Sequence, residues 1–89
     1  MIVEYDPKKN EINVQKHGLS LGFASQLDWG NALIWIDKRE DYGEARMICL
    51  APASGILYYV AFVDRRAARR VISLRRANTR EVKYYVKSG

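Results

Sequence analysis

The chain has 89 residues and a net charge of +5, from 15 lysines and arginines and 10 aspartates and glutamates. Hydrophobic residues make up 48% of it, with six glycines and two prolines, a composition typical of a folded domain and not of a disordered segment. The length predicts a single domain over residues 1–89. One cysteine, Cys49, excludes an intrachain disulfide, and His17 is the only histidine, so the chain has too few soft ligands for a closed metal site.

Residues 2–5 predict a short strand that leads into the first helix. Asp6 is a typical N-cap residue, and Pro7 suits the first helical position. Gly18 favours the left-handed conformation that ends a helix, so this helix is expected to run from Pro7 to His17.

A second short helix is predicted to follow, with Ser20 as its N-cap. Phe23, Ala24 and Leu27 fall on one face of that helix and are expected to be buried. The Trp-Gly-Asn run at 29–31 is expected to end it.

The middle of the chain predicts an antiparallel meander of three or four strands, because the connections are short. The expected strands cover residues 32–36, 46–51, 56–63 and 69–74. The third is apolar on both alternating faces, which is typical of a strand at the centre of a sheet. In the last, the period of two places Ile72 and Leu74 on one face and Val71, Ser73 and Arg75 on the other.

A final helix is predicted to begin at Asn78. Asn78 and Glu81 have the spacing of a capping box, and Val82, Tyr85 and Val86 form an apolar stripe that is expected to dock on the sheet. The order of strand, two helices, meander and C-terminal helix places this small single domain in the α+β class.

Charge is divided unevenly along the chain. Residues 1–64 carry six basic and nine acidic side chains, a net −3, whereas residues 65–89 carry nine basic and one acidic, a net +8. Seven arginines and no acid occur from position 65 to position 80: Arg65, Arg66, Arg69, Arg70, Arg75, Arg76 and Arg80. Guanidinium groups bind phosphate oxygens in pairs and stack on bases, so this segment favours nucleic-acid binding. A solvated face, or a surface for an acidic protein partner, is the alternative.

Several patches of sequence, taken together and in this order, are similar to those of one protein family. The patches are Tyr5–Lys9, Asn13 with Lys16–Leu19, Phe23–Ala24, Glu44–Arg46, and Arg70–Ala77 with Arg80–Glu81 and Tyr84–Tyr85. They resemble the BrnT toxin family of bacterial type II toxin–antitoxin systems over nearly the whole chain. The sequence departs from the family pattern at Leu74, where a small residue is usual, and at Ala51, where glycine is common.

The resemblance implies a small ribonuclease with a fold similar to the RelE-type toxins. It also implies a DNA-binding antitoxin of the BrnA type that neutralises the toxin, and a complex that represses its own operon. The expected partners are therefore an RNA substrate and an antitoxin that covers the basic face. Contact with DNA is expected only through the antitoxin.

RNA cleavage needs no metal or organic cofactor in principle, because the RNA supplies its own 2′-hydroxyl nucleophile. The enzyme must position that group, stabilise charge at phosphorus and supply a proton to the leaving oxygen, and arginine suits the second task. The predicted catalytic residues, expected in one concavity between the last strand and the last helix, are Arg75, Arg76, Arg80, Glu81 and Tyr84. The predicted RNA-binding residues are Arg46, Arg65, Arg66 and Arg69.

Some of these residues have a structural alternative. Glu81 is explained equally well by the capping box, and Tyr85 by the apolar stripe. His17 stands where a histidine can cap the last carbonyls of a helix, and Trp29 and Trp35 can stack on bases or fill the core.

Two alternatives concern Arg46 and the function itself. Arg46 can reach the face of Arg75 or simply pair with Glu44. A non-catalytic domain that binds nucleic acid or an acidic partner would use the same arginines.

The sequence also bears on where the protein acts. No apolar run approaches the roughly 18 residues that cross a bilayer, and residues 1–6 lack the basic and apolar segments of a signal peptide. We therefore expect no membrane association and a cytoplasmic location, with Cys49 as a buried reduced thiol.

Overall fold

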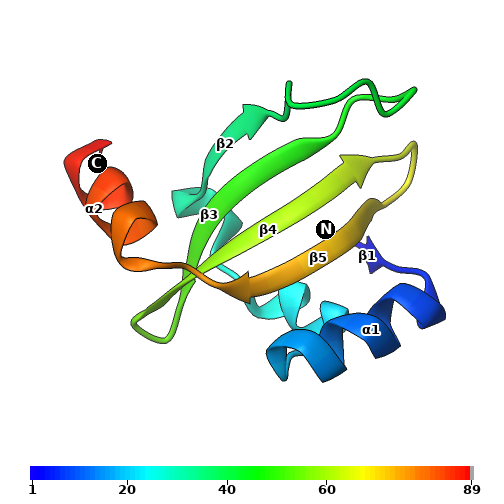
Figure 1. Ribbon diagram of the computed structural model, residues 1–89, viewed down its shortest axis with the longest axis horizontal. Helices are drawn as coiled ribbons and strands as arrows, with labels where there is room; N and C mark the ends of the chain where they lie inside the picture. Colours follow the sequence, from blue (N-terminus) through cyan, green and yellow to red (C-terminus); the bar gives the residue numbers. More distant parts are fainter. Residues whose placement is uncertain (89) are drawn as a thin grey trace.

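A five-stranded sheet forms the centre of the fold, and the helices that pack against it cover one of its two faces (Figure 1). The computed structural model describes residues 1–88. In chain order the elements are β1 (Val3–Glu4), α1 (Pro7–His17), the 3₁₀ helices η1 (Leu21–Gln26) and η2 (Trp29–Asn31), β2 (Leu33–Ile36), β3 (Met47–Ala53), β4 (Ile56–Asp64), β5 (Arg69–Arg76) and α2 (Thr79–Ser88). The strands lie in the order β1-β5-β4-β3-β2.

The α+β class is confirmed, and β4 is the central strand as predicted. Strands β2 to β5 form the antiparallel meander. β1 then pairs with β5 in parallel, so that the sheet is mixed and has five strands, one more than the meander itself.

The hairpin between β3 and β4 is tighter than predicted. Residues 52–55 were expected to form the turn, but Pro52 and Ala53 still pair with β4, and the turn consists of Ser54 and Gly55 alone. Both turn residues have positive φ, +50° and +80°, which matches the right-handed twist of the strands in a two-residue hairpin.

α1 spans the predicted residues with the predicted caps. The side chain of Asp6 accepts a hydrogen bond from the backbone N–H of Lys8, and Gly18 ends the helix with φ of +71°.

The next segment, η1, is a 3₁₀ helix and not the α-helix expected, although Ser20 caps it as predicted. Because a 3₁₀ helix has three residues per turn, Leu21, Ala24 and Leu27 share its buried face, whereas Phe23 is only half-buried. The predicted burial of Phe23 is therefore correct only in part.

A β-bulge in β5 changes the expected alternation of its side chains. The pairing of β4 with β5 skips Ile72, so Val71 and Leu74 both face the core under α1 and η1. The prediction that these two residues point to opposite faces is wrong for that reason. Arg75 lies on the face opposite Leu74, as predicted.

Asn13 holds α1 against β5. Its amide nitrogen donates to the carbonyl oxygens of Leu74 and Leu19 at 2.8 and 2.9 Å, and its oxygen accepts from the N–H of Leu74 at 3.0 Å. β1 pairs with β5 only at the first two residues of β5, so this amide takes the place of a neighbouring strand for Leu74. Asn13 thereby fixes the backbone one residue before Arg75.

α2 begins with the predicted capping box. The N–H of Glu81 donates to the side-chain oxygen of Asn78, and the N–H of Asn78 donates to the Glu81 carboxylate, both at 2.8 Å. The apolar stripe does not dock on the sheet, however. Val82 and Val86 are 40% and 70% exposed, and α2 projects from one end of the sheet (Figure 1). The helix follows β5 after two residues and is held at its first turn, so its axis leads away from the strands.

Two further findings concern the described part of the chain. No helix there is long and apolar enough to cross a bilayer, and no three His, Cys, Asp or Glu side chains are grouped to hold a metal ion. Cys49 is fully buried, and this burial raises the pKa of its thiol to about 12, which keeps the thiol protonated at neutral pH.

Asn13→Ala removes all three hydrogen bonds and leaves the backbone groups of Leu74 without partners in a buried position. We expect the free energy of unfolding to fall by about 2–4 kcal/mol, which urea titration followed by circular dichroism measures. Gln15→Ala on the exposed side of the same helix is the matched control, with an expected change within about 0.5 kcal/mol. Equal stability of the two variants would contradict the role given to Asn13.

Candidate functional site

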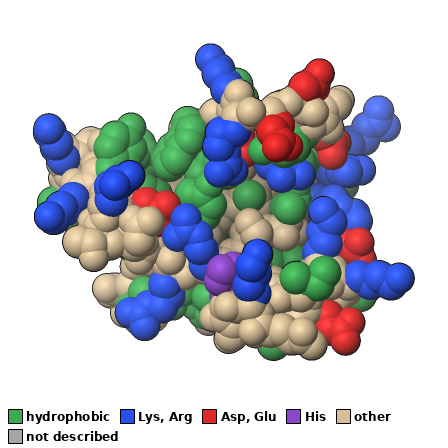
Figure 2. All heavy atoms as spheres, in the orientation of Figure 1, with side chains coloured by type: hydrophobic (Ala, Val, Ile, Leu, Met, Phe, Trp, Pro, Cys, Tyr) green, Lys and Arg blue, Asp and Glu red, His purple; other side chains and the backbone are tan. Residues whose placement is uncertain are grey.

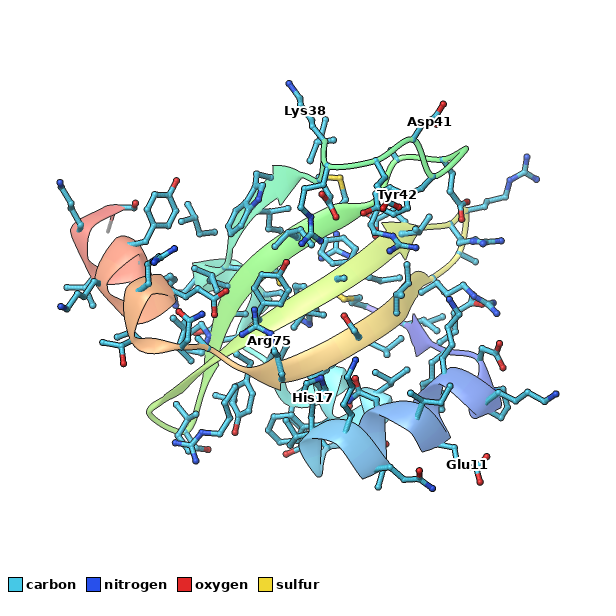
Figure 3. The ribbon with its side chains drawn as sticks, viewed as in Figure 1. Glu11, His17, Lys38, Asp41, Tyr42 and Arg75 are labelled. Carbon is cyan, nitrogen blue, oxygen red and sulfur yellow. The ribbon has the colours of Figure 1, made fainter. Side chains whose placement is uncertain are left out.

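Tyr59 and Arg75 stand opposite each other on the face of the sheet away from η1, which α2 approaches only at one end. They are direct cross-strand partners of β4 and β5, and the Arg75 guanidinium carbon lies 4.0 Å from the centroid of the Tyr59 ring. Figure 3 shows Arg75 on this open face, with Tyr42 at the far end from α2. The aromatic ring thus supports a cation that is still 31% exposed.

Glu81 orients the Arg75 guanidinium. Two nitrogens of Arg75 donate to its two carboxylate oxygens at 2.9 Å each. Burial raises the pKa of Glu81, but the hydrogen bonds from Arg75 and from the N–H of Asn78 outweigh it and give a lowered pKa. The same bonds raise the pKa of Arg75, so both groups are ionised at neutral pH.

Arg39 forms a second pair of the same kind with Asp37. Its Nε and Nη2 donate to the two oxygens of Asp37 at 2.8 Å, and the Tyr42 hydroxyl donates to the same carboxylate at 3.1 Å. The Asp37 side chain is only 2% exposed. The hydrogen bond from Arg39 is the main reason that the pKa of Asp37 lies well below its ordinary value.

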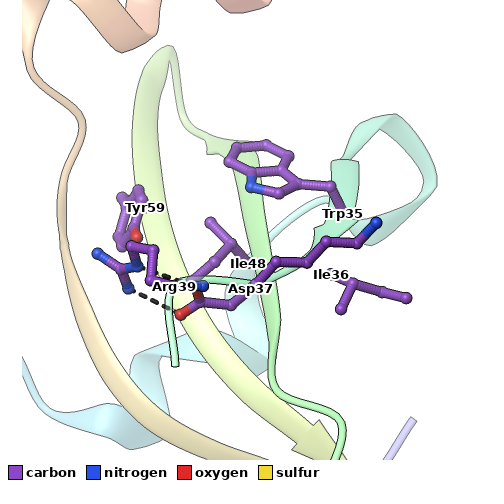
Figure 4. Close-up of a pocket in the computed structure, with 7 residues that line it drawn as sticks. Trp35, Ile36, Asp37, Arg39, Ile48 and Tyr59 are labelled. Carbon is purple, nitrogen blue, oxygen red and sulfur yellow. Dashed lines mark hydrogen bonds and ion pairs between the residues drawn. The ribbon is translucent and has the colours of Figure 1, made fainter. Parts of the chain in front are cut away.

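Arg39, Asp37 and Tyr59 line a first cavity (Figure 4), and Trp35 lines both this cavity and a second one. This first cavity has a volume of about 400 Å³ and an apolar floor at Ile48.

The second cavity, of about 370 Å³, lies between the sheet and α2. It is lined by Trp35, Leu50, Arg80, Glu81 and Tyr84, and the Tyr84 ring packs edge-to-face on Trp35 at 6.2 Å. Trp35 is 36% exposed and therefore forms a wall between the two cavities.

The arrangement leaves hydrogen-bond donors available to an anion. Each guanidinium gives two nitrogens to its carboxylate, and the third nitrogen, Nη1 of Arg39 or Nε of Arg75, has no partner among residues 1–88. Both arginines lie beside Tyr59, and each is fixed before any ligand binds. Donors held in this way suit a phosphodiester flanked by bases.

Four of the five predicted catalytic residues lie at this corner of the molecule. Arg75 contacts Glu81, and Glu81 lines the second cavity with Arg80 and Tyr84. Arg76 does not join them, because it is paired with Tyr58 on the helix-covered face and offers only its carbonyl oxygen to Arg75. Of the three arginines expected in one concavity, only Arg80 lines the second cavity, and Arg75 is linked to it through its pair with Glu81.

The predicted RNA-binding arginines are dispersed. Arg65 pairs with Glu44 at the exposed end of the sheet, and Arg66 is exposed in the same turn. Arg69 pairs with Asp64 and lies over core aromatic rings on the helix-covered face. Figure 2 shows lysine and arginine side chains around the open face, with hydrophobic side chains between them.

Arg46 stacks on Tyr42, with its guanidinium carbon 3.8 Å from the ring centroid, and its buried Nε has no hydrogen-bond partner in the described chain. It precedes β3 on the same side as Ile48, so it belongs to the open face and does not pair with Glu44.

For three residues the sequence left open a structural role, and the structure shows where each of them lies. Trp29 belongs to the core, where its indole N–H donates to the carbonyl of Ala24. The Tyr85 hydroxyl donates to the carbonyl of Asn31 at 2.6 Å and so anchors α2. His17 is exposed at the end of α1 and lines neither of these two cavities but a smaller one, of about 180 Å³, with Ile72 and Ser73 of β5.

The sequence predictions omitted Arg39, Asp37 and Tyr59. Arg39 and Asp37 lie in what the sequence presents as an ordinary polar loop, and Tyr59 lies within an apolar strand. Only the register of β4 against β5 brings Tyr59 to Arg75, and a single sequence does not reveal that register.

Comparison with known proteins adds one finding. The family model described as the ribonuclease toxin BrnT of type II toxin–antitoxin systems matches residues 5–81. No curated protein matches the sequence.

The lowered pKa values of Asp37 and Glu81 predict a loss of stability in acid. The unfolded carboxyls, which titrate near pH 4, bind protons before the folded ones do. We expect the free energy of unfolding to be constant above about pH 6 and to fall as the pH decreases from about 5 towards 2. Urea titrations at a series of pH values test this, and the double variant Asp37→Asn, Glu81→Gln should show a shallower fall. An identical pH dependence of variant and wild type would exclude these two carboxylates as its source.

Proposed function

This chain belongs to the BrnT family of ribonuclease toxins of type II toxin–antitoxin systems, and we propose that its open sheet face is the site of RNA cleavage. The observation that carries the proposal is the pair of guanidinium groups beside Tyr59. Asp37 holds Arg39 at the first cavity, and Glu81, which lines the second cavity, holds Arg75. A phosphodiester in contact with both arginines would have room for a base on either side of Trp35.

The proposed reaction needs no metal ion. The 2′ oxygen of the RNA attacks the adjacent phosphorus, the bond from phosphorus to the 5′ oxygen breaks, and the 2′ proton leaves to a base while the 5′ oxygen gains a proton. The products are a 2′,3′-cyclic phosphate and a 5′ hydroxyl. Negative charge grows on the phosphoryl oxygens in the transition state, where the free donors of Arg75 and Arg39 stabilise it.

The residues around Arg75 have distinct proposed roles. Glu81 is a positioning residue, because its lowered pKa makes it a weak base while its two oxygens hold Arg75. Arg80 contributes a further cation at the second cavity. Tyr84, with its ring 55% exposed in the same cavity, supplies the proton to the 5′ oxygen.

The biological setting follows from the family. A type II system implies a protein antitoxin, and we propose a DNA-binding protein of the BrnA type, with DNA contacted through that partner alone. We also propose that the protein acts in the cytoplasm, because its proposed substrate is cellular RNA.

Arg75→Ala removes the proposed phosphate-binding cation and leaves the capping box of α2 in place. We expect the cleavage rate to fall by about 100- to 1,000-fold, as for the loss of one oxyanion donor. The control is the adjacent Arg76→Ala, on the other face of the sheet, which should change the rate less than about threefold. Cleavage of an end-labelled RNA gives the rates, and circular dichroism checks that both variants are folded. Equal rates for the two variants would remove Arg75 from the site.

The reaction route has its own test. Cleavage of labelled RNA should persist in excess EDTA and yield ends with a 2′,3′-cyclic phosphate, identified by mass spectrometry. A single 2′-deoxynucleotide on the 5′ side of the cleaved bond removes the nucleophile and should abolish cleavage at that bond. Binding of RNA with no new ends would instead identify a non-catalytic binding domain, and cleavage of the deoxy substrate would exclude attack by the 2′ oxygen.

A further inference from the structure

α2 presents an apolar stripe that nothing in the chain covers. Val82 and Val86 are 40% and 70% exposed, and no residue of the helix is buried within the described range. Beside them, a groove of about 260 Å³ runs between Tyr85 and the start of β2 and is lined by Ala32 and Leu33. Figure 2 shows exposed hydrophobic side chains on and beside α2. We define the α2 surface as Leu33, Val82, Tyr85 and Val86.

The charges of the same helix identify the chemistry of an occupant. Arg80, Lys83 and Lys87 are exposed on α2, whereas Glu81, its one acidic residue, is neutralised by Arg75. A ligand that covers both the stripe and these cations must combine apolar side chains with carboxylates. A second copy of this chain fits poorly, because it would bring a net charge of +5 and the same three cations into the contact.

We infer that the α2 surface is the docking site of the antitoxin, through an amphipathic acidic segment that lays its apolar side on Val82 and Val86 and pairs its carboxylates with Arg80, Lys83 and Lys87. This inference rests on the proposed function for the existence of that partner. An amphipathic helix in an apolar groove is a common mode of peptide recognition.

A partner bound at the α2 surface would also affect the proposed RNA site. Arg80 lines the second cavity together with Glu81 and Tyr84, so a carboxylate bound to Arg80 competes with RNA phosphate for it. α2 is held to the sheet by the Glu81 pair with Arg75, by the packing of Tyr84 on Trp35 and by the Tyr85 hydroxyl. A partner that displaces α2 therefore alters the orientation of Arg75 without touching it.

The test uses the full chain and the antitoxin encoded beside its gene. The double variant Val82→Asp, Val86→Asp changes the stripe, and Ile12→Asp, Val14→Asp on α1, where exposure is 63% and 43%, is the matched control. We expect the first to bind the antitoxin at least about 100-fold more weakly by calorimetry and to escape neutralisation, while its RNA cleavage stays within about threefold of wild type. The control should behave as wild type in both measurements.

A second pair of variants tests the charges separately. Lys83→Glu, Lys87→Glu should weaken antitoxin binding and reduce its salt dependence, whereas Arg65→Glu, Arg66→Glu at the far turn should change neither by more than about threefold. Circular dichroism confirms that each variant is folded.

The outcomes separate this inference from the proposed function. Wild-type affinity of both α2 variants for the antitoxin overturns the docking site, whatever the cleavage rate. Loss of affinity at α2 supports it even if the wild-type chain cleaves no RNA, a result that would instead refute the proposed function. A dimer of the wild-type chain in sedimentation that Val82→Asp, Val86→Asp dissociates identifies a second copy as the occupant and also overturns the inference.

Discussion

The two-sided hydrogen bonding of the Asn13 amide to Leu74 is the constraint on which the site depends. β5 is paired with β4 along one edge, but β1 covers only its first two residues on the other edge. A side-chain amide carries an acceptor and donors with the geometry of a peptide group. The Asn13 amide on α1 can therefore bond both the N–H and the carbonyl of Leu74, as a neighbouring strand would. Because the amide is buried, leaving either backbone group of Leu74 without a partner costs more than an exposed bond would. α1, which lies along the edge of β5, thereby determines where Arg75 stands.

The position of Arg75 in turn determines where α2, the C-terminal helix, begins. The cation binds both oxygens of Glu81, and Glu81 in turn caps the first turn of α2. The Glu81 carboxylate thus holds both the Arg75 guanidinium and the start of α2. The pair explains how α2 keeps its position although it buries little apolar surface. It also means that a ligand that moves α2 would change the orientation of Arg75.

The parts that the sequence predicts well are those decided by neighbours in the chain. The caps of α1 at Asp6 and Gly18 and the capping box of α2 depend on residues within four positions. The bulge at Ile72 and the partnership of Tyr59 with Arg75 depend on how two strands pair, which local pattern does not determine. The apolar stripe of α2 was predicted to dock on the sheet, but its spacing shows only which face of the helix is apolar. The spacing does not show whether the residues that cover this face belong to the same chain.

The proposed polyanion site contains two carboxylates, which reduce its positive charge, and the geometry of the two ion pairs explains what these carboxylates contribute. Two neighbouring cations repel each other, a cost that Asp37 and Glu81 offset. The hydrogen bonds that Arg75 donates to Glu81 outweigh the repulsion from Arg39 and raise the pKa of Arg75. Each carboxylate takes one edge of its guanidinium, which removes that cost and fixes the plane of the group, and it leaves the other edge for phosphate. Under the proposed function, exposed cations outside the two cavities, such as Arg66 and Lys83, would attract RNA over longer distances. Under the proposed function, attraction and catalysis would fall to different arginines, so that Arg66→Ala would lower the association rate and Arg75→Ala the rate of the chemical step.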